Sequence, residues 1–189
     1  MWSDESTFAQ LGQTALFVRR PKGQRFREKY TNPTVKHPDS LMVWGCISSQ
    51  GRGGMTILKK NERVNSKRYI ELLESKLKVF MNIHGCKIFM QDSAPCHVSK
   101  ESRDWFQRNK IELLEWPGNS PDLNPIENVW RIMKVKVSAR CPGSLLDLQF
   151  ALKHVWALDI TQELCKNCVN SMPRRLQAVI DNKGGHTKY

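Results

Sequence analysis

Three absences limit what this chain of 189 residues can be. No apolar run approaches the ~18 residues needed to cross a bilayer, so we expect no membrane partner. The opening stretch, MWSDESTF, is acidic and has no apolar segment, which is not typical of a signal peptide. The six cysteines show no disulfide spacing, and the single CxxC at 165–168 has no second pair at zinc-finger spacing. We therefore expect an intracellular protein with reduced thiols.

Acidic residues are also scarce, since 18 Asp and Glu face 30 Lys and Arg, leaving a net charge of +12. Such a surplus favours a polyanionic partner, because each neutralised phosphate releases condensed counterions. Nucleic acid is our preferred interpretation, and generic solubilising charge is the alternative. The basic residues are dense in the proline-punctuated segment 19–40. A loop of that length inside a compact domain is usually functional or disordered. Its DNA-binding candidates are Arg19, Arg20, Lys22, Arg25, Arg27 and Lys29.

The hydrophobic pattern predicts one α/β domain covering 1–189. Two short strands are expected within 2–18. A hairpin follows, with strands at 41–49 and 55–59 and a turn at 51–54. Single strands are expected at 86–91 and 111–114. Helices are expected at 66–80, from Pro95 to about 109, from Ile126 onward, and at 145–158 and 161–180, with Pro173 interrupting the last. This order favours a mixed sheet, first an antiparallel meander and then parallel crossovers, flanked by helices. Additional helices accumulate in the C-terminal part, 126–182.

Three carboxylates are the candidate catalytic and metal-binding residues. Asp4 lies on the first strand, Asp92 follows a strand end, and Glu127 lies in the first turn of a helix. Open α/β sheets place ligand sites at strand ends. Carboxylate oxygens suit Mg²⁺ or Mn²⁺, and two such ions can activate the attacking oxygen and stabilise the leaving oxygen of a phosphodiester.

Each acid also has a structural alternative. Asp4 could be a solvated acid at a frayed terminus, and Asp92 could cap the helix that follows it. For Glu127, Asn124 is a plausible N-cap and Pro125 the first helical residue, which places Glu127 at the capping-box position. Arg131, four residues further on, could pair with it. Spacing alone leaves these alternatives open.

The sequence segments around the three acids resemble the catalytic motifs of Tc1-like transposases in the Tc1/mariner superfamily. The matching segments are WSDES at 2–6, FMQDSAPCH at 89–97 and WPGNSPDLNPIENVW at 116–130, and the ending SMPRRLQAVIDNKGGHTKY is also similar. Residues 93–126, 34 in all, separate Asp92 from Glu127, which is the spacing of the DD34E class. The resemblance covers essentially the whole chain.

This resemblance implies an RNase H-like fold in which Asp4, Asp92 and Glu127 hold two Mg²⁺ or Mn²⁺ ions. The implied function is DNA strand cleavage and strand transfer in cut-and-paste transposition, with transposon ends and a TA target as double-stranded DNA partners. It also implies a nuclear location and a possible homodimer. Segment 19–40 falls where mariner-type enzymes carry a clamp loop that reaches the partner subunit; simple phosphate contact is the other interpretation.

Two departures from the family pattern concern activity. Ser93 stands where relatives usually carry Asn, although serine can still hydrogen-bond a ligand. The paired helix-turn-helix region that reads the terminal inverted repeats is not in this sequence, so we expect a truncated copy. An inactive DNA-binding remnant is therefore the alternative function. His97 is interpreted as a hydrogen-bonding neighbour of Asp92, and Trp116, Trp130 and Trp156 as core residues.

The basic segment generates the first prediction. We expect weak, sequence-tolerant DNA binding whose affinity falls steeply with salt, because phosphate contacts position a protein without reading bases. Replacing Arg19, Arg20, Arg25 and Arg27 with alanine should flatten the dependence of log affinity on log salt concentration. Fluorescence anisotropy with a labelled duplex measures both slopes. An unchanged slope would place the DNA path away from this segment.

Overall fold

In the computed structural model, residues 1–10, 19–24, 27, 30, 38–60, 62–118 and 120–187 are described. The strands are β1 (Trp2–Ala9), β2 (Ser40–Ser48), β3 (Gly51–Ile57), β4 (Ile88–Phe89) and β5 (Glu112–Leu113). The strand expected between 11 and 18 lies outside the described residues.

One mixed sheet is built around β1. Strands β1, β2 and β3 pair antiparallel in sequence order, and β4 pairs with β5 in parallel. A parallel bridge between Trp2 and Met90 joins the two parts, with backbone hydrogen bonds from Ser3 N–H to Met90 O and from Met90 N–H to Met1 O. The strands therefore follow the spatial order β3-β2-β1-β4-β5. This is the predicted meander followed by parallel crossovers.

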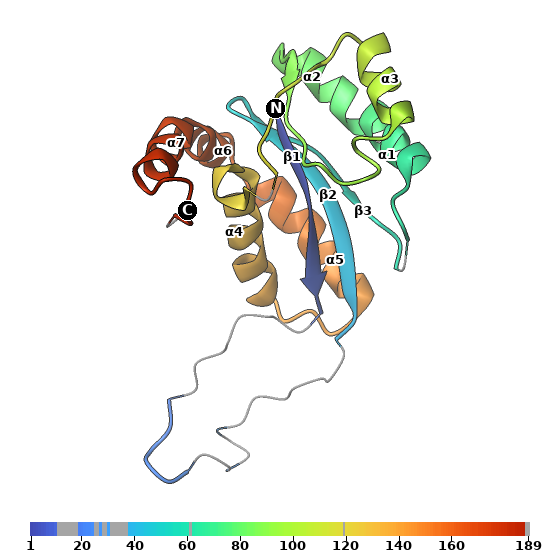
Figure 1. Cartoon of the computed structure of the whole chain (residues 1–189). Coiled ribbons are helices and arrows are strands. Elements are labelled where there is room, and N and C mark those ends of the chain that lie inside the picture. The colour runs from blue at the N-terminus through green and yellow to red at the C-terminus, as the bar shows by residue number, and fades with distance from the viewer. Residues whose placement is uncertain are drawn as a thin grey trace.

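Helices cover both faces of this sheet (Figure 1). One layer contains α1 (Ser66–Leu72), the π-turn η2 (Leu73–Leu77), α2 (Lys78–His84) and α3 (Lys100–Arg108). The other contains α4 (Ile126–Ser138), α5 (Leu145–His154), the π-turn η4 (Val155–Asp159) and α6 (Gln162–Asn170), with the 3₁₀ turn η3 (Pro121–Leu123) and α7 (Met172–Asp181) beside it. Pro173 lies in the first turn of α7, so the expected helix over 161–180 is broken in two. Among the described residues, no helix combines the length and apolarity that crossing a membrane requires.

Adjacent residues of β2 pack into two separate hydrophobic cores. Val43 and Ile47 face α4, α5 and α6, while Trp44 and Cys46 face α1, η2 and α3. All four side chains are at most 1% exposed. Burial on both faces explains why 41–49 reads as a continuous apolar run with no polar side.

Three sequence predictions of local structure were wrong. Helix α3 does not begin at Pro95: Ser99 caps it, its Oγ accepting the Ser102 N–H at 3.2 Å, and 92–98 forms turns. The hairpin turns at 49–50, because Gly51 adopts a φ of +133° that favours glycine and already pairs with Ser48.

The third concerns the helical segment 66–80. Helical spacing predicts that Tyr69, Leu73, Leu77 and Phe80 share one apolar face. The first three are buried, but Phe80 is only partly buried and Met81 takes the next core position at 4% exposure. The π-turn η2 shifts the helical register there, and such insertions have no reliable sequence signal.

The packing of α4 on β2 depends on Gly45. A Cβ at this position would lie 2.7 Å from Cη2 of Trp130 and 3.2 Å from Cη2 of Trp156, two rings stacked with centroids 5.7 Å apart. Both tryptophans are core residues, as predicted, at 1% and 7% exposure. The glycine therefore lets two large aromatic side chains lie directly on the strand.

Gly45→Ala should destabilise the domain by about 1–3 kcal/mol, because the added methyl group overpacks a well-filled core. Thermal unfolding should show a fall of ~2–4 °C for each kcal/mol lost. The matched control is Gly143→Ala, since a Cβ there meets only ordinary contact at 3.7 Å. Equal melting temperatures for the two variants would contradict the described packing.

Candidate active site

Strand β1 positions Asp4 at the centre of the sheet. Asp4 lies opposite Gly45 of β2 and on the same face as Phe8, so its carboxyl points toward the α4 layer. There the indole Nε1 of Trp130 donates a hydrogen bond to Asp4 Oδ2 at 3.2 Å. Burial, followed by the charges of Glu127 and Glu5, raises the pKa of Asp4 to about 8. Asp4 is thus not a solvated acid at a frayed end.

The turn η3 and the start of α4 position Glu127. Asn124 is extended, its Oδ1 accepts the Ile126 N–H at 3.3 Å, and its Nδ2 donates to Ser3 O at 3.3 Å, which ties the helix start to β1. The backbone N–H of Asn124 donates to Pro121 O at 2.9 Å. That N–H is the donor a capping box would use, so Glu127 does not form one, and its carboxyl lies against that of Asp4.

Asp92 follows β4 and is held by its own turn. Its Oδ1 accepts the Ala94 N–H at 3.0 Å and a hydrogen bond from Nδ1 of His97 at 2.5 Å. The hydrogen bond from His97 holds the pKa of Asp92 below its ordinary range. Asp92 therefore does not cap α3, and it stays ionised beside Asp4, whose charged form is disfavoured.

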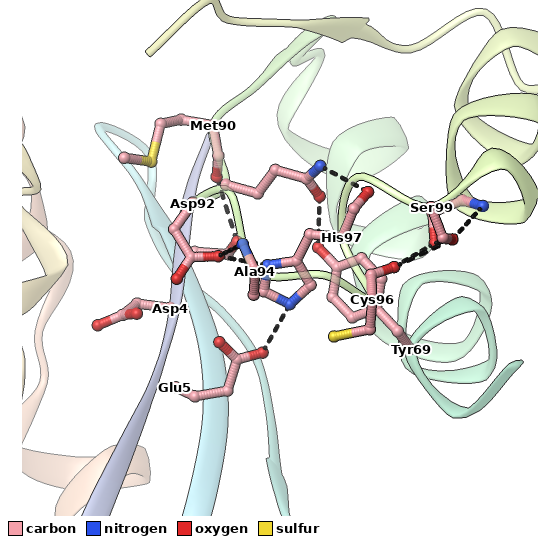
Figure 2. A network of polar contacts seen from close by, with 12 residues as sticks. Asp4, Glu5, Tyr69, Met90, Asp92, Ala94, Cys96, His97 and Ser99 are labelled. Atoms are coloured by element: carbon pink, nitrogen blue, oxygen red, sulfur yellow. Dashed lines mark hydrogen bonds and ion pairs between the residues drawn. The ribbon is translucent and has the colours of Figure 1, made fainter. Parts of the chain in front are cut away.

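His97 is the centre of a buried polar network, shown in Figure 2. The side chain is 4% exposed, and its Nε2 lies 3.3 Å from Glu5 Oε1 in an ion pair. Burial alone would lower the pKa of His97, but the contacts with Asp92 and Glu5 raise it to about 10. Tyr69 packs its ring 4.1 Å from the imidazole and donates to Gln91 Oε1 at 2.6 Å, while Gln91 Nε2 donates to His97 O at 3.2 Å.

Asp4, Asp92 and Glu127 line one cavity of about 370 Å³, whose other walls include Trp116 and Asn124. Asp4 and Asp92 lie next to each other on the same side of β1 (Figure 2). Within the described residues, no three His, Cys, Asp or Glu side chains are already close enough together to hold one ion. Sharing an ion therefore requires the three carboxyls, Asp92 above all, to draw closer than they are.

The residues of this cavity fit a hard divalent cation. Its acids offer only oxygen donors, and His97 is turned to Asp92 and Glu5 rather than left available as a soft ligand. Burial and the charges of Glu127 and Glu5 raise the pKa of Asp4, and among the described residues no Lys, Arg or His forms an ion pair that would compensate its charge. A bound Mg²⁺ or Mn²⁺ would supply that compensation.

The remaining predicted residues lie elsewhere. Arg19, Arg20, Lys22 and Arg27 are exposed and do not line the cavity, and Arg25 and Lys29 lie outside the described residues. Trp116 was expected in the core, but it is only partly buried and packs edge-on against Trp2 at 5.2 Å between ring centroids.

Sequence reasoning missed Glu5, Gln91 and Tyr69 as parts of the site. Strand alternation places Glu5 on the face opposite Asp4, where it meets His97 and not the cavity. The motif around Asp92 contains Gln91 and His97, so half of the network was visible in the sequence, but Tyr69 comes from a distant helix.

Comparison with known proteins defines the class. Residues 1–149 match the DDE superfamily endonuclease family. The Tc1 transposase of Caenorhabditis elegans is 39% identical over all of this chain and 70% of its own length, and the Tcb1 transposase of Caenorhabditis briggsae is 38% identical with the same coverage. The chain therefore belongs to the Tc1/mariner family, as a transposase catalytic domain.

Solved structures confirm the fold. The pre-cleavage Mos1 transpososome superimposes with a TM-score of 0.85 at 19% identity over 98% of this chain, which spans 56% of that chain's length. The catalytic domain of Mos1 mariner transposase gives a TM-score of 0.73 at 20% identity, covering 98% of this chain and 82% of that one. The RNase H-like fold expected from the sequence is thus confirmed.

Asp4→Asn tests the electrostatics of the site. Because the folded protein holds the Asp4 proton up to about pH 8, whereas an unfolded Asp releases it near its ordinary pKa of 3.8, the metal-free domain loses stability as pH rises through this window. Asparagine removes that loss and keeps an acceptor for Trp130. We expect the metal-free variant to melt higher than the wild type, by ~2–4 °C per kcal/mol recovered, with the gap widening from pH 5 to pH 8.

Differential scanning fluorimetry in EDTA measures this gap. Adding Mn²⁺ should raise the melting temperature of the wild type and leave Asp4→Asn almost unchanged, because a ligand stabilises only the state that binds it. Asp104→Asn, which changes an exposed acid of α3, serves as the control. A difference in melting temperature between Asp4→Asn and the wild type that does not change with pH would show that the pKa of Asp4 is not raised.

Proposed function

We propose that this domain cuts DNA strands and joins the freed 3′ end to target DNA in cut-and-paste transposition. The observation that carries the proposal is the convergence of Asp4, Asp92 and Glu127 on one cavity in a domain of the DDE endonuclease family. Water attacks the scissile phosphate first, and the freed 3′-OH attacks the target phosphate second. Both steps are in-line displacements that need no covalent protein intermediate.

In this proposal Asp4, Asp92 and Glu127 hold two divalent ions, and His97 orients Asp92. Bound Mg²⁺ or Mn²⁺ would activate the attacking oxygen and stabilise the leaving oxygen of the phosphodiester. Support for these metals comes from the oxygen donors of the site and from Mos1 paired-end complexes that were solved with Mg and with Mn. The two-ion count comes from the resemblance to the transposase family and from the two-metal chemistry of phosphodiester cleavage.

The proposed partners are double-stranded transposon ends and a TA target, bound by a homodimer in the nucleus. The net charge of +12 supports a DNA partner. The Mos1 transposase paired-end complex with left transposon end supports the pairing of two ends, and the Mos1 strand transfer complex supports the second chemical step.

Asp92→Asn separates chemistry from binding. The substitution keeps size and hydrogen-bonding capacity but removes a negative charge where the two ions would meet. Since changes of groups that merely support a metal site cost 10–100-fold, loss of a ligand should reduce Mg²⁺- or Mn²⁺-dependent nicking of supercoiled plasmid by at least about 100-fold. DNA affinity without metal should hold or rise slightly, because an acid near the phosphates is gone.

Asp104→Asn again supplies the matched control, and it should nick like the wild type. A wild type that nicks DNA no faster than Asp92→Asn, yet binds it, would establish the non-catalytic remnant instead. A wild type that nicks rapidly and an Asp92→Asn variant that nicks equally well would remove the acid triad as the active site.

A further inference from the structure

A second cavity adjoins the carboxylate site. It has a volume of about 350 Å³ and shares Glu127 with the first cavity. Its walls are the last residues of β1, Thr7 to Ala9, and the outward face of α4. Figure 1 shows α4 lying alongside β1, and α4 leads from the level of the site toward the end of that strand. The two cavities therefore meet at Glu127, one of the three candidate catalytic acids.

The floor of this groove follows one helical face. Glu127, Arg131, Lys134 and Ser138 line it at positions i, i+4, i+7 and i+11 of α4. With a rise of 1.5 Å per residue, Arg131 lies about 6 Å and Lys134 about 10 Å beyond Glu127 along the helix axis. Among the described lining residues, Glu127 is the single acid. The charge of the groove therefore changes from negative at the site to positive beyond it.

These two cations do not serve the fold as ion-pair partners. Neither Arg131 nor Lys134 forms an ion pair with another described residue, and the expected pairing of Arg131 with Glu127 is not made. Lys136, on the other side of the same helix, and Arg140, just beyond its end, both bind Asp159, at 2.7 Å and 3.3 Å. On one face of α4, Lys136 is thus held in an ion pair within the fold. On the other face, Arg131 and Lys134 are free of ion pairs with described residues and can contact a ligand.

Packing holds the Lys134 side chain in the groove. The Nζ of Lys134 lies 5.9 Å from the ring centroid of Phe8, which is 2% exposed and packs edge-on against Trp130. This contact places the ammonium group over the groove rather than over open solvent. Arg131 is exposed at the end nearer Glu127.

We propose that this groove binds the DNA strand that leaves the active site, with Arg131 and Lys134 contacting its phosphates. The inference rests on the proposed function, which puts the scissile phosphate at Asp4, Asp92 and Glu127. The axial rise of DNA is 3.4 Å per nucleotide of a strand, so the two cations contact phosphates about two and three nucleotides from the reacting one. A polyanion suits a groove whose basic side chains lack acidic partners.

Site-specific photocrosslinking tests the path of the strand. A benzophenone amino acid is placed at Val135, which lines the groove and is 53% exposed, or at Val79 of α2, which is 49% exposed on the opposite layer. A short labelled duplex is the probe, irradiated in EDTA so that no cleavage occurs. We expect crosslinks from position 135 at least tenfold above those from position 79. On a duplex whose Mn²⁺-dependent nick has been mapped, they should fall within about five nucleotides of it.

A paired-charge experiment gives an independent readout. Arg131→Ala/Lys134→Ala is compared with Lys67→Ala/Arg103→Ala, which removes the same charges from exposed positions of α1 and α3. Metal-free anisotropy over about 50–200 mM salt should show the slope of log affinity falling by about 1.8 for the groove variant if the contacted DNA is duplex, or about 1.4 if it is single-stranded. The control should change the slope by much less, and Arg131→Lys/Lys134→Arg should retain it.

Both measurements are independent of catalysis, so their failure can be told from failure of the proposed function. A protein that crosslinks to DNA through position 135 but never nicks it would support the groove as a DNA site and contradict the proposed enzymatic activity. Equal crosslinking from 79 and 135, an unchanged slope, or protein–protein crosslinks in place of DNA crosslinks from 135 would each overturn the groove as a DNA site.

Discussion

Repulsion between the carboxyls of Asp4 and Glu127 is the constraint that the rest of this domain accommodates. The two groups lie together in a partly buried cavity, and burial and the charge of Glu127 are the two leading causes that raise the pKa of Asp4 to about 8. Such a placement opposes folding in the absence of a cation. Two apolar cores, one on each face of the sheet, supply the compensating stability. Site and scaffold meet directly in Trp130, which packs over Gly45 and donates to Asp4.

Different interactions hold Asp4 and Asp92, and the pKa values of the two carboxyls therefore shift in opposite directions. Asp92 is exposed and compensated by His97, so its pKa is lowered, whereas no described residue forms an ion pair with Asp4. His97 in turn connects Asp92 to Glu5, on the other face of β1, and to Gln91 through its backbone oxygen. One arm of the site is thus ionised and oriented in advance, while Asp4 depends on a cation for full ionisation.

Helix α4 combines three roles by helical periodicity alone. Its buried stripe, with Val129, Trp130 and Met133, fills the core. Lys136, together with Arg140 just beyond the helix, binds Asp159 of η4. The face that begins at Glu127 is left to the cavity and the groove. A single substitution on α4 therefore affects the core, the carboxylate cavity or the groove according to its angular position on the helix.

The sequence by itself determined the fold class, the order of meander and crossovers, the family, and which acids to examine. Those features depend on local hydrophobic periodicity and on contiguous sequence motifs such as SPDLNPIENVW, which can be recognised without knowledge of the tertiary contacts. Only the tertiary structure decided that Asn124 N–H bonds Pro121 and leaves Glu127 to face Asp4, that 92–98 turns instead of starting a helix, and that Tyr69 and Glu5 join His97. Each outcome depends on which of several possible hydrogen-bond partners a group meets in the folded chain, some of them nearby, as Pro121 is to Asn124, and some distant, as Glu5 and Tyr69 are to His97. Contacts between distant segments, such as that of Asn124 Nδ2 with Ser3 O and the bridge of Trp2 to Met90, bring these groups together, and local sequence does not record them.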